Sequence, residues 1–350
     1  MPSRIVLLFT HLLLALVLGF SSAQQAKTFS NPVLSSAGAD PHIVFHEGFY
    51  YMTYTTGADI RFRKAASLAG LDQAEAVQVF QPTGDGCCNV WAPEFHLLDG
   101  PNGKHWYLYY TAGPEKCCSE QRMYVAESAS TDPMGPYTLK GKVFDAQHDF
   151  WSIDASILKA EGKLYLIYSG TPQDHMPYEK PQNIYIASME NPWTLSSERS
   201  EISTPSLFWE MQGAAVNEGP VVLYHNDDLF LAFSGSGCWT DDYKLGLLKA
   251  NVHANLLDPA SWMKLPDPVL TRSDANQAFG PGHNGFFKSP DGTEDWVVYH
   301  ANAFPGQQCG GARLARAQKI TWGADGLPIF GTPDPLWVDV PLPSGDPGLP

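Results

Sequence analysis

One unit recurs five times along this 350-residue chain, and it constrains the fold more than any other feature of the sequence. Each copy has an ionisable residue, an apolar pair that begins three positions later, a short turn and an aromatic-rich apolar run. The ionisable residues are Asp40, Glu94, Asp154, Glu218 and His283, at spacings of 54, 60, 64 and 65 residues. A repeat of this length that is built from short strands is typical of a β-propeller blade. We therefore predict an all-β chain that forms a single five-bladed β-propeller.

The five ionisable residues are expected to occupy equivalent positions at the start of the innermost strand of each blade. Innermost strands border the central channel of a propeller, so these side chains would meet near its axis. Four of the five are carboxylates, and each carboxylate raises the pKa of its neighbours. One Asp or Glu before a strand is usually a solvated turn residue, but a convergent set indicates a catalytic or cation-binding site.

The N-terminus has the features of a secretory signal peptide, with Arg4 ahead of an apolar run over residues 5–20 and small residues at 21–23. A membrane anchor is the alternative, but the apolar run is short for a membrane span and no similar run follows. We therefore predict a signal peptide over residues 1–23 and a five-bladed β-propeller domain over residues 24–350. The protein is expected to be secreted to the extracellular space and to have no membrane attachment.

The charge and composition restrict the class of partner. The formal net charge is -15, whereas nucleic-acid binding needs a basic surface. We therefore expect no nucleic acid as a partner, and the charge is compatible with a neutral substrate. The aromatic content of 12% suits both β-strands and a sugar-binding site.

The six cysteines fit an oxidising compartment. They comprise two adjacent doublets and two single residues: Cys87 and Cys88, Cys117 and Cys118, Cys238, and Cys309. Six cysteines allow about 15 pairings, and sequence alone selects none of them. We expect the two doublets to lie on neighbouring loops of the second blade and to cross-link, which leaves Cys238 and Cys309. A zinc site is the weaker alternative, because adjacent cysteines lack the usual ligand spacing.

The ends of the chain are expected to meet. The tail from Thr332 is rich in proline and has little periodicity. It is expected to close the ring with residues 31–34, although the sequence does not specify the pairing.

Three of the acids suit glycoside hydrolysis. That reaction uses two carboxyl groups on either side of the sugar, one protonated to donate to the leaving oxygen and one ionised to activate water. A third acid beside the donor keeps the pKa of the donor high through like-charge repulsion. Asp40, Asp154 and Glu218 can supply these three groups from three blades.

Short motifs around these acids resemble a known family. "ADPHIV" around Asp40, "SIDASIL" around Asp154 and "NEGPVVL" around Glu218 are similar to the catalytic signatures of glycoside hydrolase family 43. "NVWAPEFH", "GPGHNGF" and an arginine before "QKITWGADGLPIF" also match the pattern of that family. The resemblance covers essentially all of the chain after the signal, and it implies a five-bladed propeller that inverts anomeric configuration.

The resemblance also implies roles for individual residues. Asp40 would be the general base, Glu218 the general acid, and Asp154 the residue that tunes the pKa of Glu218. His283 would lie on the axis near a water-coordinated calcium or sodium ion, as a metal contact through water. No cofactor would be required for the chemistry.

Three further residues are implied to contact substrate. Arg313 would donate to sugar hydroxyls and hold Asp40 ionised, with Arg316 as the alternative arginine. Trp91 would form an apolar wall for a sugar face, with a place in the core as the alternative. Glu94 would form hydrogen bonds near the pocket.

Within the family, the motifs look most like the arabinofuranosidase branch, including exo-acting α-1,5 enzymes. The implied function is the release of L-arabinofuranose from arabinan or from arabinose-decorated polysaccharides such as arabinoxylan, by a monomer. A β-xylosidase and an endo-α-1,5-arabinanase stay open, because the three acids are common to all of them. A non-catalytic sugar-binding propeller ranks lower, because all three acids are present. A retaining fructan hydrolase also ranks lower, because its Asn-Asp-Pro-Asn-Gly signature is absent from the sequence.

Overall fold

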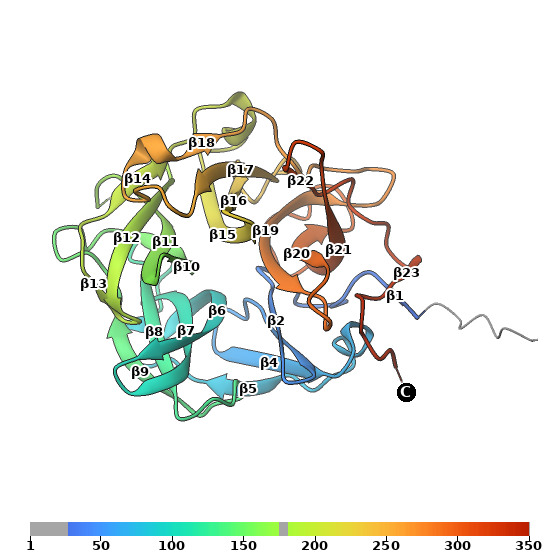
Figure 1. Cartoon of the computed structure of the whole chain (residues 1–350), viewed down its shortest axis with the longest axis horizontal. Coiled ribbons are helices and arrows are strands. Elements are labelled where there is room, and N and C mark those ends of the chain that lie inside the picture. Colours follow the sequence, from blue (N-terminus) through green and yellow to red (C-terminus); the bar gives the residue numbers. More distant parts are fainter. Residues whose placement is uncertain (1–26, 175–180, 350) are drawn as a thin grey trace, which may run out of the picture.

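The computed structural model describes residues 27–174 and 181–349, so the predicted signal peptide lies outside the described residues. The regular secondary structure of the described chain is β-strand, apart from 3₁₀ turns of three residues. Its blades are five antiparallel sheets that surround a common centre (Figure 1). The prediction of an all-β, five-bladed propeller is confirmed for these residues. No helix in the described part of the chain is both long and apolar enough to cross a membrane.

Each blade is a meander in which consecutive strands pair. In the third blade, β14 also pairs with β12. The blade strands, in chain order, are β2 (His42–His46), β3 (Phe49–Thr53), β4 (Ile60–Ala65) and β5 (Val77–Phe80); β6 (Cys88–Gly100), β7 (Gly103–Gly113), β8 (Arg122–Ser128) and β9 (Tyr137–Lys142); β10 (Ser152–Ala160), β11 (Lys163–Gly170), β12 (Asn183–Asn191), β13 (Thr194–Leu195) and β14 (Ser200–Ser203); β15 (Asn217–His225), β16 (Asp228–Gly235), β17 (Lys244–Asn251) and β18 (Met263–Lys264); and β19 (Phe279–Lys288), β20 (Asp295–Asn302), β21 (Leu314–Trp322) and β22 (Pro328–Ile329).

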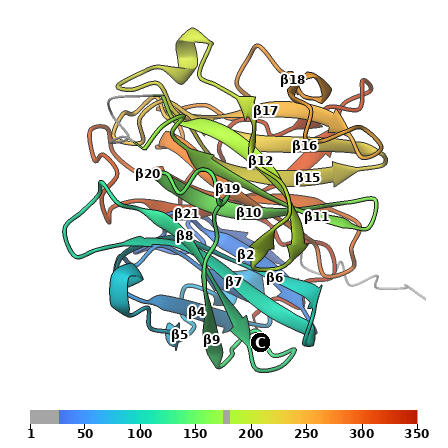
Figure 2. The same ribbon diagram turned by 90° about the vertical axis from the view of Figure 1, so that its left-hand side faces the viewer.

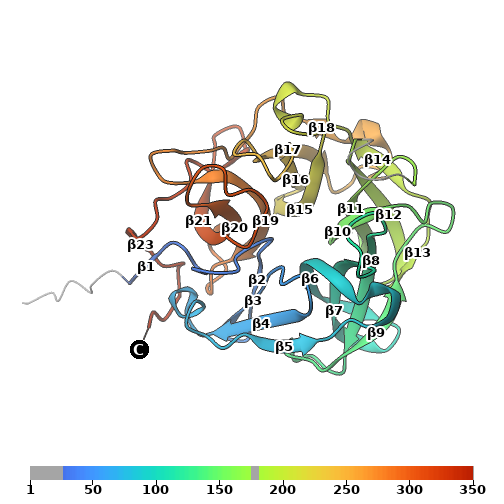
Figure 3. The same cartoon turned by 180° about the vertical axis from the view of Figure 1, so that it is seen from behind.

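The first strand of each blade lies nearest the centre of the ring. Figures 1 and 3 show β2, β6, β10, β15 and β19 around this centre from opposite faces. Seen from the side in Figure 2, blade 4 lies above blade 3, and blades 2 and 1 lie below. β10 is buried along almost its whole length, whereas β9 at the rim is mostly exposed or half-buried. Each innermost strand has two adjacent apolar residues, such as Ile157 and Leu158 in β10, because both of its faces are covered there.

A β-bulge interrupts the first strand of blades 2 to 5 before it settles into regular pairing. The residues two positions before the start of regular pairing, one in each blade, have a left-handed backbone. Their φ values are 51° at Asp40, 42° at Ala92, 59° at Asp154, 57° at Gly219 and 45° at His283. Positive φ is uncommon for residues other than glycine, and a bulge redirects the side chain that it carries. The repeated bulges therefore define one layer of residues around the axis.

This layer corrects the predicted equivalence of the five ionisable residues. Asp40, Asp154 and His283 share the left-handed position, but Ala92 and Gly219 occupy it in blades 2 and 4. Glu94 therefore lies two residues further along its strand, and Glu218 lies one residue earlier. All five ionisable residues lie three positions before an apolar pair, so the sequence pattern did not reveal this difference. Where both faces of a strand are buried, adjacent residues are both apolar, and such a pair fits either register.

The hydrophobic core is divided among the blade interfaces. Among the described residues, five apolar clusters form, one between each pair of neighbouring blades. Between blades 3 and 4, for example, Ile167 and Ile186 share a cluster with Leu231 and Phe233. A blade thus buries its faces only against its neighbours, so the complete ring holds the innermost strands in position.

The two ends of the chain close the ring together. β1 (Thr28–Ser30) pairs with β23 (Asp339–Pro341) in antiparallel order, and the two strands lie side by side in Figure 1. Asn31 then exchanges two hydrogen bonds with the backbone of Ala317 in blade 5, at 2.9 and 2.8 Å. Its carbonyl oxygen accepts the N–H of Trp337 in the tail at 2.7 Å. The N-terminal segment therefore lies between the last blade and the tail.

The disulfides differ from the predicted pairing. Cys87 bonds to Cys88, and Cys117 bonds to Cys118, so each doublet closes on itself instead of cross-linking to the other. The third disulfide joins Cys238 to Cys309 across 71 residues. It connects the loop after β16 in blade 4 to the loop after β20 in blade 5.

We predict that only the long-range disulfide contributes substantially to global stability. The double substitution Cys238→Ser and Cys309→Ser opens a long loop and is expected to lower the free energy of unfolding by about 2–4 kcal/mol. The matched control, Cys87→Ser with Cys88→Ser, opens a ring of adjacent residues and is expected to cost much less. Chemical denaturation of both double variants measures the difference, and equal losses would contradict the prediction.

Candidate active site

All five blades contribute to one cavity of about 640 Å³. Six of the residues singled out from the sequence line it: Asp40, Trp91, Asp154, Glu218, His283 and Arg313. Glu94 is not among the described residues that line it. The cavity thus brings together the three acids expected to act in catalysis, each buried and each from a different blade.

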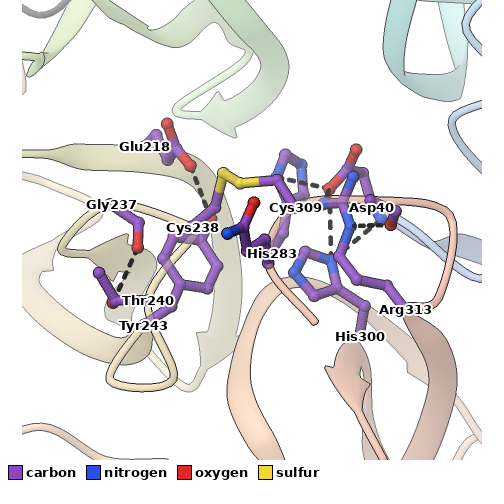
Figure 4. The surroundings of a disulfide bond; sticks show 12 residues. Asp40, Glu218, Gly237, Cys238, Thr240, Tyr243, His283, His300, Cys309 and Arg313 are labelled. Carbon is purple, nitrogen blue, oxygen red and sulfur yellow. Dashed lines mark hydrogen bonds and ion pairs between the residues drawn. A yellow bond between two sulfur atoms is a disulfide. The ribbon is translucent and has the colours of Figure 1, made fainter. Parts of the chain in front are cut away.

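Among the three acids, Asp40 has the contacts that most favour its ionised form. Its Oδ1 accepts a hydrogen bond from Arg313 at 2.8 Å, and its Oδ2 accepts one from the Thr55 hydroxyl at 2.6 Å. Its backbone N–H donates to Nδ1 of His300 at 3.1 Å, and Nδ1 of His283 lies 3.4 Å from Oδ1 (Figure 4). Burial opposes the charge, but the Arg313 guanidinium and the two imidazoles outweigh it and hold the pKa of Asp40 well below its usual value.

Glu218 has the opposite electrostatic balance. Burial raises its pKa to about 7, and the negative charge of Asp40 adds to this increase. The Tyr243 hydroxyl donates to Oε1 at 2.9 Å and opposes the increase, because this hydrogen bond stabilises the ionised form. Gly282 makes room for the Tyr243 ring, since a Cβ at Gly282 would lie 2.3 Å from a ring carbon. Glu218 is therefore protonated over most of the acidic pH range.

Asp154 contacts the backbone of Gly219, the residue that follows Glu218. The N–H of Gly219 donates to Oδ2 of Asp154 at 2.9 Å, and the N–H of Asp154 donates to the Thr111 hydroxyl at 3.0 Å. Burial, followed by the charges of Glu218 and Asp40, raises the pKa of Asp154 well above its usual value. Ionisation of Glu218 therefore disfavours ionisation of Asp154.

The walls of the cavity include several aromatic and sulfur-containing side chains. Trp91, Trp151 and Trp239 line it, together with Cys238 and Cys309 of the long-range disulfide. Trp91 is half-buried, so it is a wall residue and not part of a hydrophobic cluster. Figure 4 shows the disulfide between Glu218 and Asp40 in projection, beside the loop that carries Arg313. The disulfide thus ties the loop of Trp239 to the loop that precedes Arg313.

The two candidate arginines occupy different environments. Arg313 reaches Asp40 in the cavity. Arg316 is fully buried, and its NH1 group donates to the backbone carbonyls of Asn276 at 3.0 Å and Asp334 at 3.2 Å. Arg316 therefore fastens the tail and a neighbouring loop to blade 5, and it does not face the cavity.

Glu94 contacts two histidines outside the cavity. Its Oε2 lies 2.9 Å from Nε2 of His96 and 3.9 Å from Nδ1 of His42. Burial raises the pKa of Glu94, and it lowers the pKa of His42 to about 4 and that of His96 to about 3. These three residues also form a group whose ligand atoms all lie within 4.8 Å of one another.

His283 does not belong to that group. Burial lowers its pKa, and its nearest carboxylate, Asp40, is already bonded to Arg313 and Thr55. Calcium prefers about six to eight oxygen ligands, which the described side chains beside His283 do not supply directly. The calcium or sodium ion near His283 therefore stays a prediction, with water as the expected contact.

Three residues of the site were not predicted from the sequence: Tyr243, His300 and Thr55. Each forms a hydrogen bond with a predicted acid. His300 lies on the second strand of its blade, and Thr55 and Tyr243 lie in the loops after the second strands of theirs. The sequence held a partial signal for Tyr243, since Gly282 beside His283 indicates a close approach. It did not indicate which residue approaches, because that contact joins two blades.

The family model described as glycosyl hydrolases family 43 matches residues 29–328 of this chain. An extracellular exo-α-(1→5)-L-arabinofuranosidase of Streptomyces avermitilis is 39% identical over 347 residues, which cover 94% of this chain and 70% of that protein. An enzyme with the same name from Streptomyces chartreusis is 36% identical, over 81% of this chain and 85% of that protein. The crystal structure of an α-L-arabinofuranosidase from Lactobacillus brevis matches with a TM-score of 0.81 at 34% identity, covering 89% of this chain and 98% of that one.

We predict that Tyr243 lowers the pKa of Glu218. Tyr243→Phe removes one hydrogen bond to a charged group, worth about 1.5 kcal/mol, so the proton affinity of Glu218 should rise about tenfold. ¹³C NMR titration of the glutamate carboxyl groups measures this change. Tyr299→Phe is the matched control, because that buried hydroxyl donates to Gln318. An unchanged Glu218 titration in Tyr243→Phe would contradict the prediction.

Proposed function

Because this chain belongs to family 43 of the glycosyl hydrolases, we propose that it is a secreted, inverting enzyme that releases L-arabinofuranose from arabinan or arabinose-decorated polysaccharides. The observation that carries the proposal is the arrangement of three buried carboxylates in one cavity, of which Asp40 is hydrogen-bonded to the Arg313 guanidinium. Asp40 has a low pKa, whereas Asp154 and Glu218 have raised pKa values. An inverting glycosidase needs this division into one ionised base and one protonated acid.

Asp40 is the proposed general base. Its ionised carboxylate accepts a proton from a water molecule, which then attacks the anomeric carbon from the face opposite the leaving group. Arg313 and Thr55 hold the carboxylate in one orientation through hydrogen bonds to its two oxygens. Both contacts favour the charged form, so the base is ready at mildly acidic pH.

Glu218 is the proposed general acid. With a pKa of about 7, its carboxyl group is protonated at mildly acidic pH and donates that proton to the glycosidic oxygen. Asp154 modulates this acid, because the two carboxyl groups share protons and cannot both ionise without repulsion. The bond from Gly219 to Asp154 also fixes the backbone beside the acid.

The remaining cavity residues are proposed to bind the sugar. Arg313 has further N–H groups that can donate to hydroxyls, and Trp91 offers an apolar face for the ring. His283 lines the cavity with its Nδ1 3.4 Å from Oδ1 of Asp40, and we propose it as a further hydrogen-bonding group for the sugar. The acid and the base are both side chains, so we expect no cofactor to take part in the chemistry.

The proposed substrate and location rest on the relatives. Both Streptomyces enzymes are named extracellular and exo-acting on α-(1→5)-linked arabinofuranosides, which supports secretion and release of terminal residues by this chain. An arabinan or arabinoxylan chain is thus the proposed partner, with the protein acting as a monomer.

Product analysis on a substrate panel tests this function. We expect arabinose from linear arabinan, branched arabinan or arabinoxylan and from an aryl α-L-arabinofuranoside, and no xylose from an aryl β-xyloside. ¹H NMR during the first turnovers should show the β-anomer of arabinose, because inversion of an α-linkage requires it. A first-formed α-anomer would contradict the mechanism, and release of xylose alone would contradict the substrate.

Leaving-group dependence separates the acid from the base. Glu218→Gln should reduce kcat on arabinan by about 10²–10⁴-fold and much less on an aryl glycoside whose leaving group needs no proton. Asp40→Asn should reduce both activities by similar factors, because water activation is needed for either substrate. Circular dichroism checks that both variants remain folded. Equal losses on the two substrates for Glu218→Gln would remove Glu218 from the role of acid.

A further inference from the structure

A second layer of residues lies next to the bulge layer along the innermost strands. It consists of the first regularly paired residue of each strand, two positions after the left-handed residue: His42, Glu94, Ser156, Val221 and Gly285. Residues two apart on a strand point to the same face, about 6–7 Å further along. The side chains of this second layer therefore face the axis beyond the acids of the cavity.

The polar members of this layer gather on one side. Glu94 Oε2 lies 3.9 Å from Nδ1 of His42 and 2.9 Å from Nε2 of His96, which is two positions further along the strand of Glu94. The His42 and His96 rings are 5.3 Å apart between centroids. His42 and Glu94 are buried, and His96 is half-buried with 19% of its side chain exposed. None of the three lines the catalytic cavity.

His42 is held with an unpaired nitrogen directed at the carboxylate. Its Nε2 lies 3.3 Å from the carbonyl oxygen of Phe95, and a carbonyl only accepts, so this nitrogen carries the hydrogen. Nδ1 then bears a lone pair, and it is buried without a hydrogen-bond partner. Two acceptors, this lone pair and Glu94 Oε2, thus face each other across 3.9 Å. A buried arrangement of this kind is unfavourable unless a cation or another donor lies between them.

Ser156 lies beside the same carboxylate. Its hydroxyl favours the ionised form of Glu94. The layer therefore places an anionic oxygen next to the unpaired Nδ1 of His42.

We propose that His42, Glu94 and His96 form a binding site for a transition-metal ion of the zinc class. Two imidazole nitrogens and one carboxylate oxygen are a common protein ligand set for zinc, with a fourth position for water. Tetrahedral zinc with bonds of about 2.1 Å places its ligand atoms about 3.4 Å apart, between the distances of 2.9 and 3.9 Å found here. The hydrogen bond from His42 to Phe95 is the backbone contact that commonly orients a metal-binding histidine.

The site links two blades and is separate from the axial ion predicted beside His283. His42 is on β2 of blade 1, whereas Glu94 and His96 are on β6 of blade 2. Two nitrogen ligands favour zinc, cobalt or nickel over calcium or sodium. The exposed edge of His96 provides a path for the ion, and binding requires His96 to transfer its hydrogen from Nε2 to Nδ1.

Metal titration of the tag-free full chain tests the proposal. After chelator treatment and dialysis, isothermal titration with zinc chloride should give one site per chain, and calcium chloride should give no binding at the same site. Cobalt chloride should produce visible absorption bands of a low-coordinate complex with nitrogen ligands, and zinc should abolish them. Absence of stoichiometric zinc binding, or displacement of zinc by calcium at equal concentration, would overturn the proposal.

Two ligand variants and one control locate the site. His42→Gln and His96→Gln should each weaken zinc binding by at least about 10–100-fold, and the thermal shift caused by zinc should disappear. His253→Gln should bind zinc as the parent does, although it removes an exposed histidine that lies 2.9 Å from Glu161. If one ligand variant does not fold, the other still decides. Unchanged affinity in a folded ligand variant, or loss of binding in His253→Gln, would refute the assignment.

Discussion

Three carboxylates share one buried cavity, and a guanidinium contacts only one of them. Arg313 bonds to Asp40, whereas Glu218 has a neutral tyrosine hydroxyl and Asp154 has a backbone N–H. Burial alone would raise the pKa of all three. The arginine reverses this effect at Asp40, so the pKa of Asp40 is lowered whereas the pKa values of Glu218 and Asp154 are raised. The proposed chemistry depends on this asymmetry, because a base and an acid must exist together at one pH.

The closed ring stabilises the fold enough to hold these buried groups in place. Each blade buries its faces against its neighbours, and the two chain ends close the last interface. The innermost strands are therefore fixed, and the bulges at their starts can hold left-handed residues at Asp40, Asp154 and His283. Strained backbone of this kind persists only where the surrounding structure determines it.

The bulges also divide the polar residues of the axis into two groups. Asp40, Asp154 and His283 occupy the left-handed position, with Glu218 one residue earlier, and all four line the cavity. His42 and Glu94 are two residues further along and face His96 instead. A displacement of two residues on a strand keeps the side chain on the same face but moves it to another layer. Glu94 thus belongs to a different chemical environment from the acid in the next blade, Asp154.

The sequence by itself determined the five-bladed all-β fold and singled out Asp40, Asp154, Glu218 and His283, because repeat length and residue type are local properties. Trp91 and Arg313 were found only through the resemblance of short motifs to a known family. Only the tertiary structure decided the register of Glu94 and Glu218, since the two adjacent apolar residues after each bulge fit either register. It also decided that the cysteine doublets close on themselves, and that Tyr243 and His300 reach the acids. These contacts join residues far apart in the chain, and they depend on how neighbouring blades pack, which no local pattern encodes.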